Sequence, residues 1–527
     1  MSTKAATNST VQVEQVTSID AQNVVRSVGA TSVRPRSWPW VMLGGVLLLF
    51  SYGANNIALA AWLAPVFLLR FVRLHRPRLW LPLVYLLALG ASAFQLRGMV
   101  PIPGIGYAIF LVINAIPFVI PYLIDRWLVP RIGGVAGTLV FPSACVTLEY
   151  LNSLGPYGSW GAVAYSQYGN LPLLQILSIT GLWGIAFLMA WFASAANLLW
   201  EEGWSSIRAR AGAYACGITI MAVLLLGGAR LALFPASAKT VRIASLSKRP
   251  VVPSANDASW QRLLQNQPTA DDLANMRAWG RAVDDDLLAR AELEAQAGAK
   301  IVFWGEANAP LFKDEEAAFV GRGSELASRY QIYLGMAVGV WNTGKNPPLE
   351  NKLILIKPDG QVAWQYNKLR PVPGPEAAMQ IRGDGRLHAL DTPFGRLSSV
   401  ICFDADFPRV LAQAGTLGAD IILDPSNDWR AIDPWHTQMA SFRVIEQGVN
   451  LIRQTSNGLS AAYDYEGHRL AAMDHYHTSD YVMISEVPTR GVRTFYSRCG
   501  DWFAWASLAC LLMLAALALK KGTRHAA

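Results

Sequence analysis

Charged residues and paired cysteines are scarce in this sequence. In a chain of 527 residues, only 16% are Asp, Glu, Lys or Arg, whereas 52% are hydrophobic. A single soluble globule needs more polar surface than this, so the composition favours a membrane protein that carries a soluble module. The five cysteines form no Cys-x-x-Cys pair and no His/Cys spacing typical of zinc: Cys145, Cys216, Cys402, Cys499 and Cys510. Neither a disulfide scaffold nor a metal site is therefore indicated.

The amino-terminal segment lacks apolar residues as well. Residues 1–37 contain few large apolar groups and no periodicity, which predicts a disordered cytoplasmic tail. No apolar core is followed by a small-residue cleavage site, so this segment is not a secretory signal peptide. The net charge is +8, but Lys and Arg are scattered between apolar blocks and do not form one basic face. This distribution favours a membrane protein over a nucleic-acid binder.

Long apolar blocks fill the first half of the chain. They span residues 38–54, 56–72, 79–96, 104–124, 133–154, 171–199 and 211–234, and an eighth lies at 501–519. A membrane helix needs about 20 apolar residues, so the first two blocks are short. We expect about eight transmembrane helices, with about seven in a bundle at 38–234. The last of the expected helices lies in the segment 493–519, which begins with a connector from the preceding domain. A cytoplasmic tail is expected at 520–527.

The basic residues predict the orientation of these helices. Positive residues gather in alternate loops and at the chain ends: Arg34, Arg36, Arg70, Arg73, Arg76, Arg78, Arg126, Arg131, Arg208, Arg210, Lys520, Lys521 and Arg524. The intervening loops at 52–56 and 155–170 have none. The positive-inside rule then places the amino terminus in the cytoplasm and residues 235–500 on the outer side.

The loop at 155–174 is uncharged and rich in Gly and aromatic residues. Such a composition is expected at a membrane interface. Anchoring and the lining of a lipid entrance are equally compatible with it.

Residues 235–492 have a different pattern, in which short β-rich runs alternate with helical segments. Strands are expected near 240–245, 300–304, 331–340, 351–356, 361–364, 421–423, 450–455 and 459–463. Helices are expected near 269–299, 315–329, 408–417 and 435–447. This alternation predicts a layered α/β domain with a central sheet.

Cys402 ends a β-branched run that breaks at Asp404, so a strand presents its thiol at a sharp turn. An isolated cysteine is more often a core residue, and a nucleophilic thiol needs a base or a positive field nearby. Glu306 and Lys368 each close another β-run. Taken singly, each is more often a solvated strand end. At the ends of successive strands of one sheet, however, the three groups would meet, with the carboxylate as base and the ammonium stabilising an oxyanion.

The order Glu306, Lys368, Cys402, each after a β-run, resembles the Glu-Lys-Cys triad of the nitrilase superfamily. The surrounding sequence is similar to a membrane-bound branch of that superfamily, the apolipoprotein N-acyltransferases. The similar segments are 304–306, 367–373, 401–404, 425–429, 438–440, 443–446, 453–458 and 493–496. Together with segments of the apolar blocks, the resemblance covers about residues 40–519.

The resemblance implies an αββα sandwich, without cofactor or metal, on a membrane bundle in the bacterial cytoplasmic (inner) membrane, with the catalytic domain on the periplasmic side. It implies that Glu306 is the general base and that Cys402 attacks an acyl ester of a phospholipid while Lys368 helps to hold the oxyanion. The resulting thioester would acylate the amine of a diacylglyceryl-cysteine apolipoprotein. No nucleic acid is implied as a partner.

Further site residues follow from the resemblance. Glu376 matches an additional active-site glutamate, although a solvated loop carboxylate is an equal alternative. Trp260 and Trp429 are candidates for substrate contact. The family's usual Cys-Tyr-Glu reads Cys402-Phe403-Asp404 here, which removes a hydroxyl, shortens a carboxylate and borders the substrate pockets.

The alternatives are a membrane-tethered amidase that hydrolyses a carbon–nitrogen bond, a divergent paralogue with another amine acceptor, and a catalytically inactive membrane scaffold. A transporter is disfavoured because no span carries a cluster of ionisable groups at mid-membrane depth.

Overall fold

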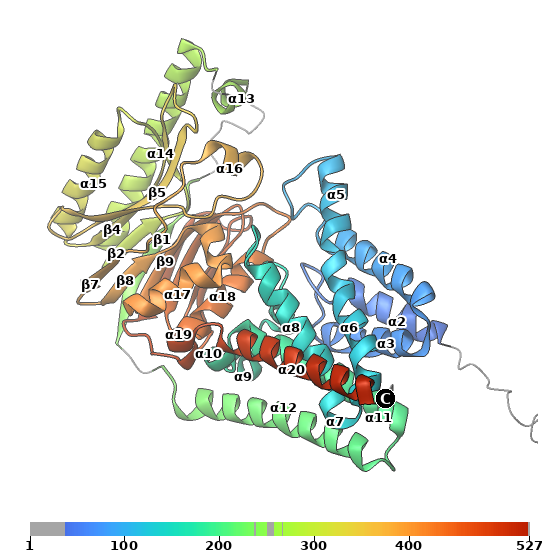
Figure 1. Cartoon of the computed structure of the whole chain (residues 1–527). Coiled ribbons are helices and arrows are strands. Elements are labelled where there is room, and N and C mark those ends of the chain that lie inside the picture. Colours follow the sequence, from blue (N-terminus) through green and yellow to red (C-terminus); the bar gives the residue numbers. More distant parts are fainter. Residues whose placement is uncertain (1–36, 237–238, 250–257, 266, 525–527) are drawn as a thin grey trace, which may run out of the picture.

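The protein consists of a helical region and an α/β domain (Figure 1). The computed structural model describes residues 37–236, 239–249, 258–265 and 267–524. Nearly all of the tail expected at 1–37, including Arg34 and Arg36, lies outside these residues, and so does the side chain of Trp260.

The helical region holds the apolar blocks of the sequence. Its helices are α2 (Trp38–Leu49), α3 (Ala58–Leu74), α4 (Pro77–Gln95), α5 (Ile105–Asn114), α6 (Ile116–Ile132), α7 (Gly134–Gly137), α8 (Val140–Ser153), η1 (Val163–Gln167), α9 (Leu171–Leu174), α10 (Leu177–Thr180), α11 (Leu182–Glu202), α12 (Ile207–Leu233) and, after the α/β domain, α19 (Phe495–Cys499) and α20 (Trp502–Arg524).

Six helical segments of the described chain are long and apolar enough to cross a membrane: Pro77–Gln95, Ile105–Ile132, Gly134–Ser153, Leu182–Glu202, Ile207–Leu233 and Trp502–Lys521. The expected number of about eight is therefore too high. The difference lies in the first two blocks, because α2 has 12 residues and α3 has 17. About 20 residues are needed to span the apolar core of a bilayer.

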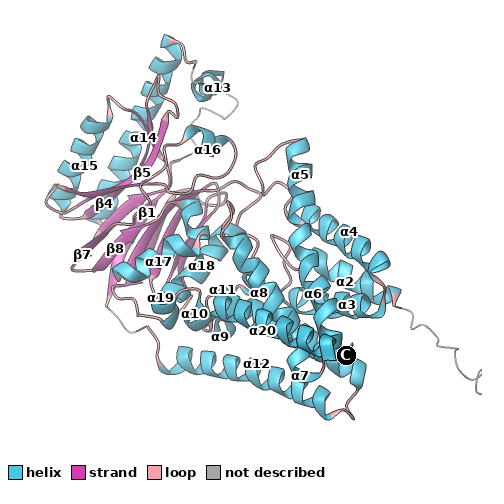
Figure 2. Ribbon diagram, viewed as in Figure 1, coloured by secondary structure: helices cyan, strands magenta, loops and turns pink. Residues whose placement is uncertain are grey.

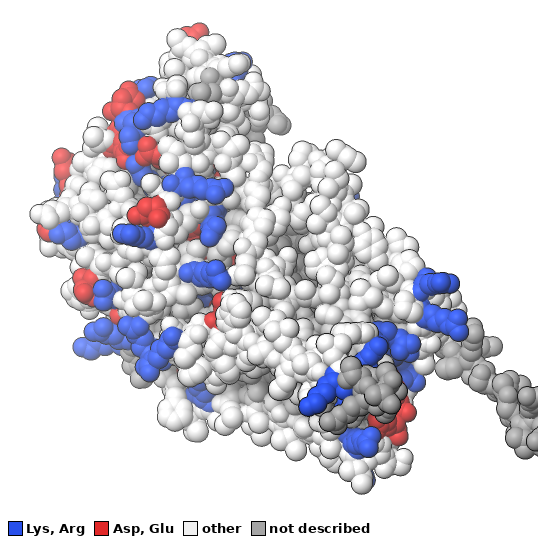
Figure 3. Space-filling model, in the orientation of Figure 1, with Lys and Arg blue, Asp and Glu red and all other residues white. Residues whose placement is uncertain are grey.

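The distribution of charge agrees with a multi-pass membrane protein. Figure 3 shows Lys, Arg, Asp and Glu over the α/β domain and at the far end of the helical region, near the carboxyl terminus. The surface between them is almost free of charge on the face shown. A belt of this kind is what a bilayer requires, since a charged side chain is costly in its apolar core.

Two sheets form the centre of the α/β domain (Figure 2). One contains β1 (Thr240–Leu246), β2 (Ile301–Trp304), β3 (Ala309–Phe312), β4 (Tyr333–Trp341), β5 (Leu349–Ile356), β6 (Val362–Asn367) and β13 (Val482–Pro488), in the order β13-β1-β2-β4-β5-β6 with β3 beside β4. The other contains β7 (Ala389–Thr392), β8 (Gly395–Ser399), β9 (Ile421–Asn427), β10 (Asn450–Ser456), β11 (Leu459–Tyr463) and β12 (Arg469–Asp474), in the order β12-β11-β10-β9-β8-β7.

Helices cover the outer faces of the two sheets. The main helices are α14 (Ala270–Gln296) and α15 (Glu316–Tyr330) on the first sheet, and α17 (Pro408–Leu417) and α18 (Trp435–Gln447) on the second; α13 (Ala258–Leu264) and α16 (Pro375–Met379) are short. This αββα sandwich confirms the predicted fold class. The expectation of one central sheet is wrong, because β7 to β12 pair only with one another among the described strands.

The helical region and the α/β domain are joined by buried polar contacts. Ser159, in the aromatic loop after α8, donates its backbone N–H (2.8 Å) and its hydroxyl (2.7 Å) to the carbonyl oxygen of Asp406. On α18, the Arg443 guanidinium donates to Tyr165, and the Glu446 carboxylate accepts the backbone N–H of Leu182 at 2.9 Å. These contacts fix the sandwich over one end of the bundle.

Candidate active site

Cys402 lies where β8 gives way to the short 3-10 helix η2 (Cys402–Asp406). Its φ of 52° is in the left-handed region, which L-residues adopt rarely and mainly at functional sites. The backbone N–H of Cys402 donates to Asp424 Oδ1 at 2.9 Å, and this bond holds the turn. The thiol is buried, with Sγ 4.0 Å from both the carbonyl oxygen of Asn427 and Oδ1 of Asp428.

Glu306 and Lys368 follow β2 and β6 at one end of the first sheet. Lys368 Nζ donates to Glu306 Oε1 at 2.7 Å and to Glu376 Oε1, on α16, at 2.6 Å. Asn351 on β5 donates its amide to the same oxygen of Glu306 at 2.6 Å. The structure therefore brings Glu306, Lys368 and Glu376 into one cluster. Cys402 follows a strand of the second sheet, and Glu306 and Lys368 both act electrostatically on its thiol, so the two sheets contribute groups to the same region.

The charges of the cluster act on the Cys402 thiol. Burial raises the pKa of Cys402 well above its ordinary value, the Glu306 carboxylate raises it further, and Lys368 and Arg453 oppose the rise. The resting thiol is therefore protonated and needs a base. Burial alone would lower the pKa of Lys368, but Glu306 and Glu376 outweigh it and raise that pKa, so Lys368 carries a full positive charge. Burial also raises the pKa of Glu376.

Asp404 ties the cysteine turn to the lysine loop. Its carboxylate accepts the Tyr366 hydroxyl at 2.7 Å and the backbone N–H groups of Arg370 (2.7 Å), Leu369 (3.1 Å) and Ile401 (3.1 Å). Burial raises the pKa of Asp404 to about 6, against these hydrogen bonds. Asp404 is therefore a positioning residue that holds the loop after Lys368 against the turn of Cys402.

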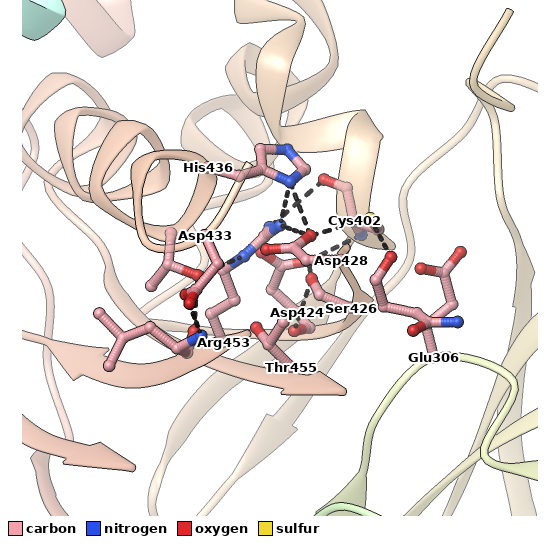
Figure 4. A network of polar contacts seen from close by, with 12 residues as sticks. Glu306, Cys402, Asp424, Ser426, Asp428, Asp433, His436, Arg453 and Thr455 are labelled. Carbon is pink, nitrogen blue, oxygen red and sulfur yellow. Dashed lines mark hydrogen bonds and ion pairs between the residues drawn. The ribbon is translucent and has the colours of Figure 1, made fainter. Parts of the chain in front are cut away.

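A second network of buried charges lies on the other sheet beside Cys402 (Figure 4). Arg453 on β10 pairs with Asp424 at 2.6 Å and with Asp428 at 3.3 Å. His436 on α18 lies between two carboxylates, with Nδ1 2.8 Å from Asp428 and Nε2 2.9 Å from Asp406. Burial and Arg453 lower the pKa of His436, but the two carboxylates outweigh them and raise it to about 9.

This network was not predicted as part of the site. The raised pKa favours an imidazolium that donates from Nε2 to Asp406, at the end of η2, and from Nδ1 to Asp428. The Arg453 guanidinium also lies 2.9 Å from Nδ1, so Arg453 and Asp428 share this side of the ring. Asp424, in turn, holds the backbone N–H of Cys402. No sequence signal marks His436, because it lies in a helix, Trp435–Gln447, in which polar and apolar residues are mixed, and only the fold buries nearly all of them.

An apolar cavity of about 320 Å³ extends from Cys402 into the helical region. Phe403, Trp429 and His436 line it near the thiol, and Leu48, Ala88, Phe141, Met189 and Ala190 are among the residues that line it within the bundle. Tyr157 and Trp160 bring the aromatic loop into the wall, which favours the lining role of that loop over simple anchoring. Trp429 is fixed by a 2.8 Å bond from its indole N–H to the carbonyl oxygen of Gly98.

Two clusters in the described part of the chain have the composition of a metal site. One is Cys402, Asp428 and His436. Its Asp428 is already paired with the Arg453 guanidinium and with a cationic His436, and these positive charges disfavour a cation there. The other, Asp464, Glu466 and His468, lies away from the thiol on the turn after β11.

Comparisons with known proteins agree with this geometry. Residues 262–495 match the carbon-nitrogen hydrolase family, and residues 44–195 match the apolipoprotein N-acyltransferase N-terminal domain. A protein of Geobacter metallireducens named apolipoprotein N-acyltransferase is 27% identical over 529 residues, which cover 93% of this chain and 96% of that protein. A protein of the same name from Bradyrhizobium diazoefficiens is 28% identical, over 69% of this chain and 70% of that one.

A solved amidase structure from Nesterenkonia sp. is 17% identical, with a TM-score of 0.37, and covers 48% of this chain and 92% of that chain. The two family matches occupy the two structural parts described above, in the same order along the chain. The chain belongs to the nitrilase (carbon-nitrogen hydrolase) superfamily, in its membrane-bound apolipoprotein N-acyltransferase branch.

Proposed function

We propose that this protein is a membrane N-acyltransferase that moves a fatty acyl chain from a phospholipid, through a thioester on Cys402, to the amino-terminal amine of a diacylglyceryl-cysteine apolipoprotein. The observation that carries the proposal is the apolar cavity that continues from the buried thiol into the membrane helices. An acyl chain is an apolar ligand, and a cavity lined by apolar side chains with few polar groups suits it.

In the first step, Glu306 takes the proton of the Cys402 thiol, and the thiolate attacks the ester carbonyl of the phospholipid. An ammonium group has three donors, and Lys368 uses two of them on Glu306 and Glu376. The third N–H has no acceptor among the described residues, and in this scheme it stabilises the oxyanion of the tetrahedral intermediate. When the intermediate collapses, Glu306 returns its proton to the departing oxygen, and a lysophospholipid leaves.

In the second step, the amine of the acceptor attacks the thioester carbonyl. Glu306 accepts the proton that the amine loses, Lys368 again stabilises the oxyanion, and the amide forms as the C–S bond breaks. Glu306 then returns the proton to the Cys402 sulfur. The amide product and the free thiol complete the cycle.

Glu376 serves to position Lys368 in this scheme, since it binds the same ammonium group as Glu306 and is partly exposed. Phe403 contributes an aromatic ring to the cavity wall. We infer that the replacement of Tyr by Phe at this position affects the fit of the acyl chain and leaves the proton transfers intact. The arginine-rich alternate loops support a topology with the amino terminus in the cytoplasm and the sandwich on the periplasmic side.

The test is the detection of the acyl-enzyme. We expect purified protein, mixed with phospholipid in micelles, to gain the mass of one acyl chain on Cys402. The Cys402→Ala and Glu306→Gln variants should gain none, and Cys499→Ala, which changes an exposed cysteine, should behave as the wild type.

An amine acceptor separates the alternatives. Addition of a diacylglyceryl-cysteine peptide should discharge the acyl-enzyme and leave the peptide N-acylated. Discharge to free fatty acid at the same rate with or without the peptide would identify a hydrolase. A wild-type protein that is never acylated would refute the proposal.

A further inference from the structure

The turn between β11 and β12 carries a cluster of ligating side chains away from the proposed active site. It reads Asp464-Tyr465-Glu466-Gly467-His468. One ligand atom from each of Asp464, Glu466 and His468 lies within 4.8 Å of the other two. His468 Nδ1 is 3.0 Å from Asp464 Oδ2 and 3.8 Å from Glu466 Oε2.

The Glu466 carboxylate is the unusual member of this cluster. The residue is only 1% exposed, and its Oε2 has no hydrogen-bond partner among the described residues. That orphan oxygen is the atom that faces His468. A buried carboxylate oxygen without a donor is costly, and an ordered cation is a usual remedy.

The surrounding charges leave the cluster short of positive charge. Two carboxylates, Asp464 and Glu466, face a single imidazole, His468. Arg230 donates to Ser178 at 2.8 Å. No salt bridge between Arg230 and Glu466 is present in the described structure.

We propose that Asp464, Glu466 and His468 bind a divalent transition-metal ion of the Zn²⁺ class. One imidazole nitrogen with two carboxylates suits Zn²⁺, whereas Ca²⁺ and Mg²⁺ prefer sites built from oxygen alone. Two ligands that hold Zn²⁺ in tetrahedral geometry lie about 3.3 Å apart, and the two distances from His468 Nδ1 bracket this value. His468 is 42% exposed, so solvent can supply the ion and the fourth ligand.

The position of the site indicates what the ion does. A backbone N–H from Ala236, three residues beyond the end of α12, bonds to the Glu466 side chain. Gln175, between α9 and α10, donates to the carbonyl oxygen of Glu466 at 2.9 Å. The ion therefore fixes the turn at the point where the α/β domain meets the membrane helices.

The proposal is tested with full-length protein purified in detergent and freed of metal. Co²⁺ is the optical probe, and Zn²⁺, Ca²⁺ and Mg²⁺ are the competitors. We expect one Co²⁺ site with visible d–d bands and no near-ultraviolet thiolate-to-cobalt charge transfer. Zn²⁺ should displace this Co²⁺, whereas Ca²⁺ and Mg²⁺ should not.

Variants assign the site. His468→Ala and Glu466→Gln should each weaken Zn²⁺ binding by more than about 100-fold. Each variant removes a residue that contacts the ion, and even the loss of a residue that only hydrogen-bonds to a ligand costs about 10- to 100-fold. His477→Ala is the matched control: this histidine is 75% exposed, pairs with Asp474, and should bind as the wild type. His468 is itself exposed, so its replacement tests the site without disturbing the core.

Two results would overturn the proposal. One is the absence of Zn²⁺-displaceable Co²⁺ binding. The other is binding that survives His468→Ala but is lost in Cys402→Ser, which would place the ion in the thiol cluster instead.

Discussion

The buried His436 ring should make the stability of the α/β domain depend on pH. Its pKa is about 9 in the folded protein, against 6.5 for an unperturbed histidine. A group with a raised folded pKa stabilises the fold fully below its unfolded pKa. This contribution declines as the pH rises and is lost above the folded pKa. The window for His436 therefore runs from about pH 6.5 to about pH 9.

The size of the effect follows from the difference between the two pKa values. Each unit corresponds to about 1.4 kcal/mol, so a difference of roughly 2.5 units corresponds to about 3 kcal/mol. The physical source is the pair of carboxylates, Asp428 and Asp406, that hold the ring from both sides. Above pH 9 the neutral ring keeps only one N–H donor for two acceptors.

The assay is urea unfolding of the wild type and of His436→Asn at a series of pH values from 6 to 10. Unfolding of the domain is monitored by its sensitivity to a protease. We expect the gap in unfolding free energy between the two proteins to shrink by about 3 kcal/mol across this range. Titration of the Cys402 thiol is common to both and cancels in the difference.

His477→Asn serves as the control, because this histidine is exposed and its variant should follow the wild type at every pH. A gap that stays constant from pH 6 to pH 10, or that widens, would refute the assignment of a cationic His436.

Two further predictions concern buried charge and the cavity. Arg453→Met leaves the buried Asp424 carboxylate without its cation and Asp428 with His436 alone, and should destabilise the domain by about 3–5 kcal/mol in the same urea assay. Arg396→Met removes a 40% exposed arginine that pairs with an exposed aspartate, and should cost about 1 kcal/mol or less. Equal effects of the two variants would contradict this. Ala190→Phe places a larger side chain in the cavity and should prevent the end of a long acyl chain from being buried there. The lost burial of methylene groups is worth about 2 kcal/mol, so acyl-enzyme formation with long chains should fall by roughly 30-fold. Short chains should react at the wild-type rate. Ala506→Phe, on an exposed face of α20, should leave chain preference unchanged.

Most regular elements could be predicted from the sequence, because they depend on local patterns. The helix at 435–447 and the strands at 450–455 and 459–463 lie where periodicity placed them, within a residue. The strands β3, β7, β12 and β13 were not predicted. β3 and β7 have four residues each, and β12 is largely exposed, so their patterns are too short or too polar to stand out.

The number of sheets could not be predicted in this way. A β-run shows that a strand exists, but not which strand it pairs with. β1 pairs with β13, more than 200 residues later in the chain, whereas β6 and β7, which are consecutive in the chain, lie at the edges of different sheets. The ends of β2 and β6 therefore meet the turn after β8 across a sandwich and not along one edge.

The sequence by itself determined the chemistry and the setting of the protein: a thiol, a carboxylate and an ammonium at strand ends, beside helices apolar enough for a membrane. These features depend on residue identity and on spacing over a few residues. Only the tertiary structure decided that Asp404 holds the lysine loop, that two carboxylates raise the pKa of His436, and that an apolar cavity connects Cys402 to the bundle. The physical reason is that burial and electrostatic fields arise from groups distant in the chain, and they exist only once those groups are packed together.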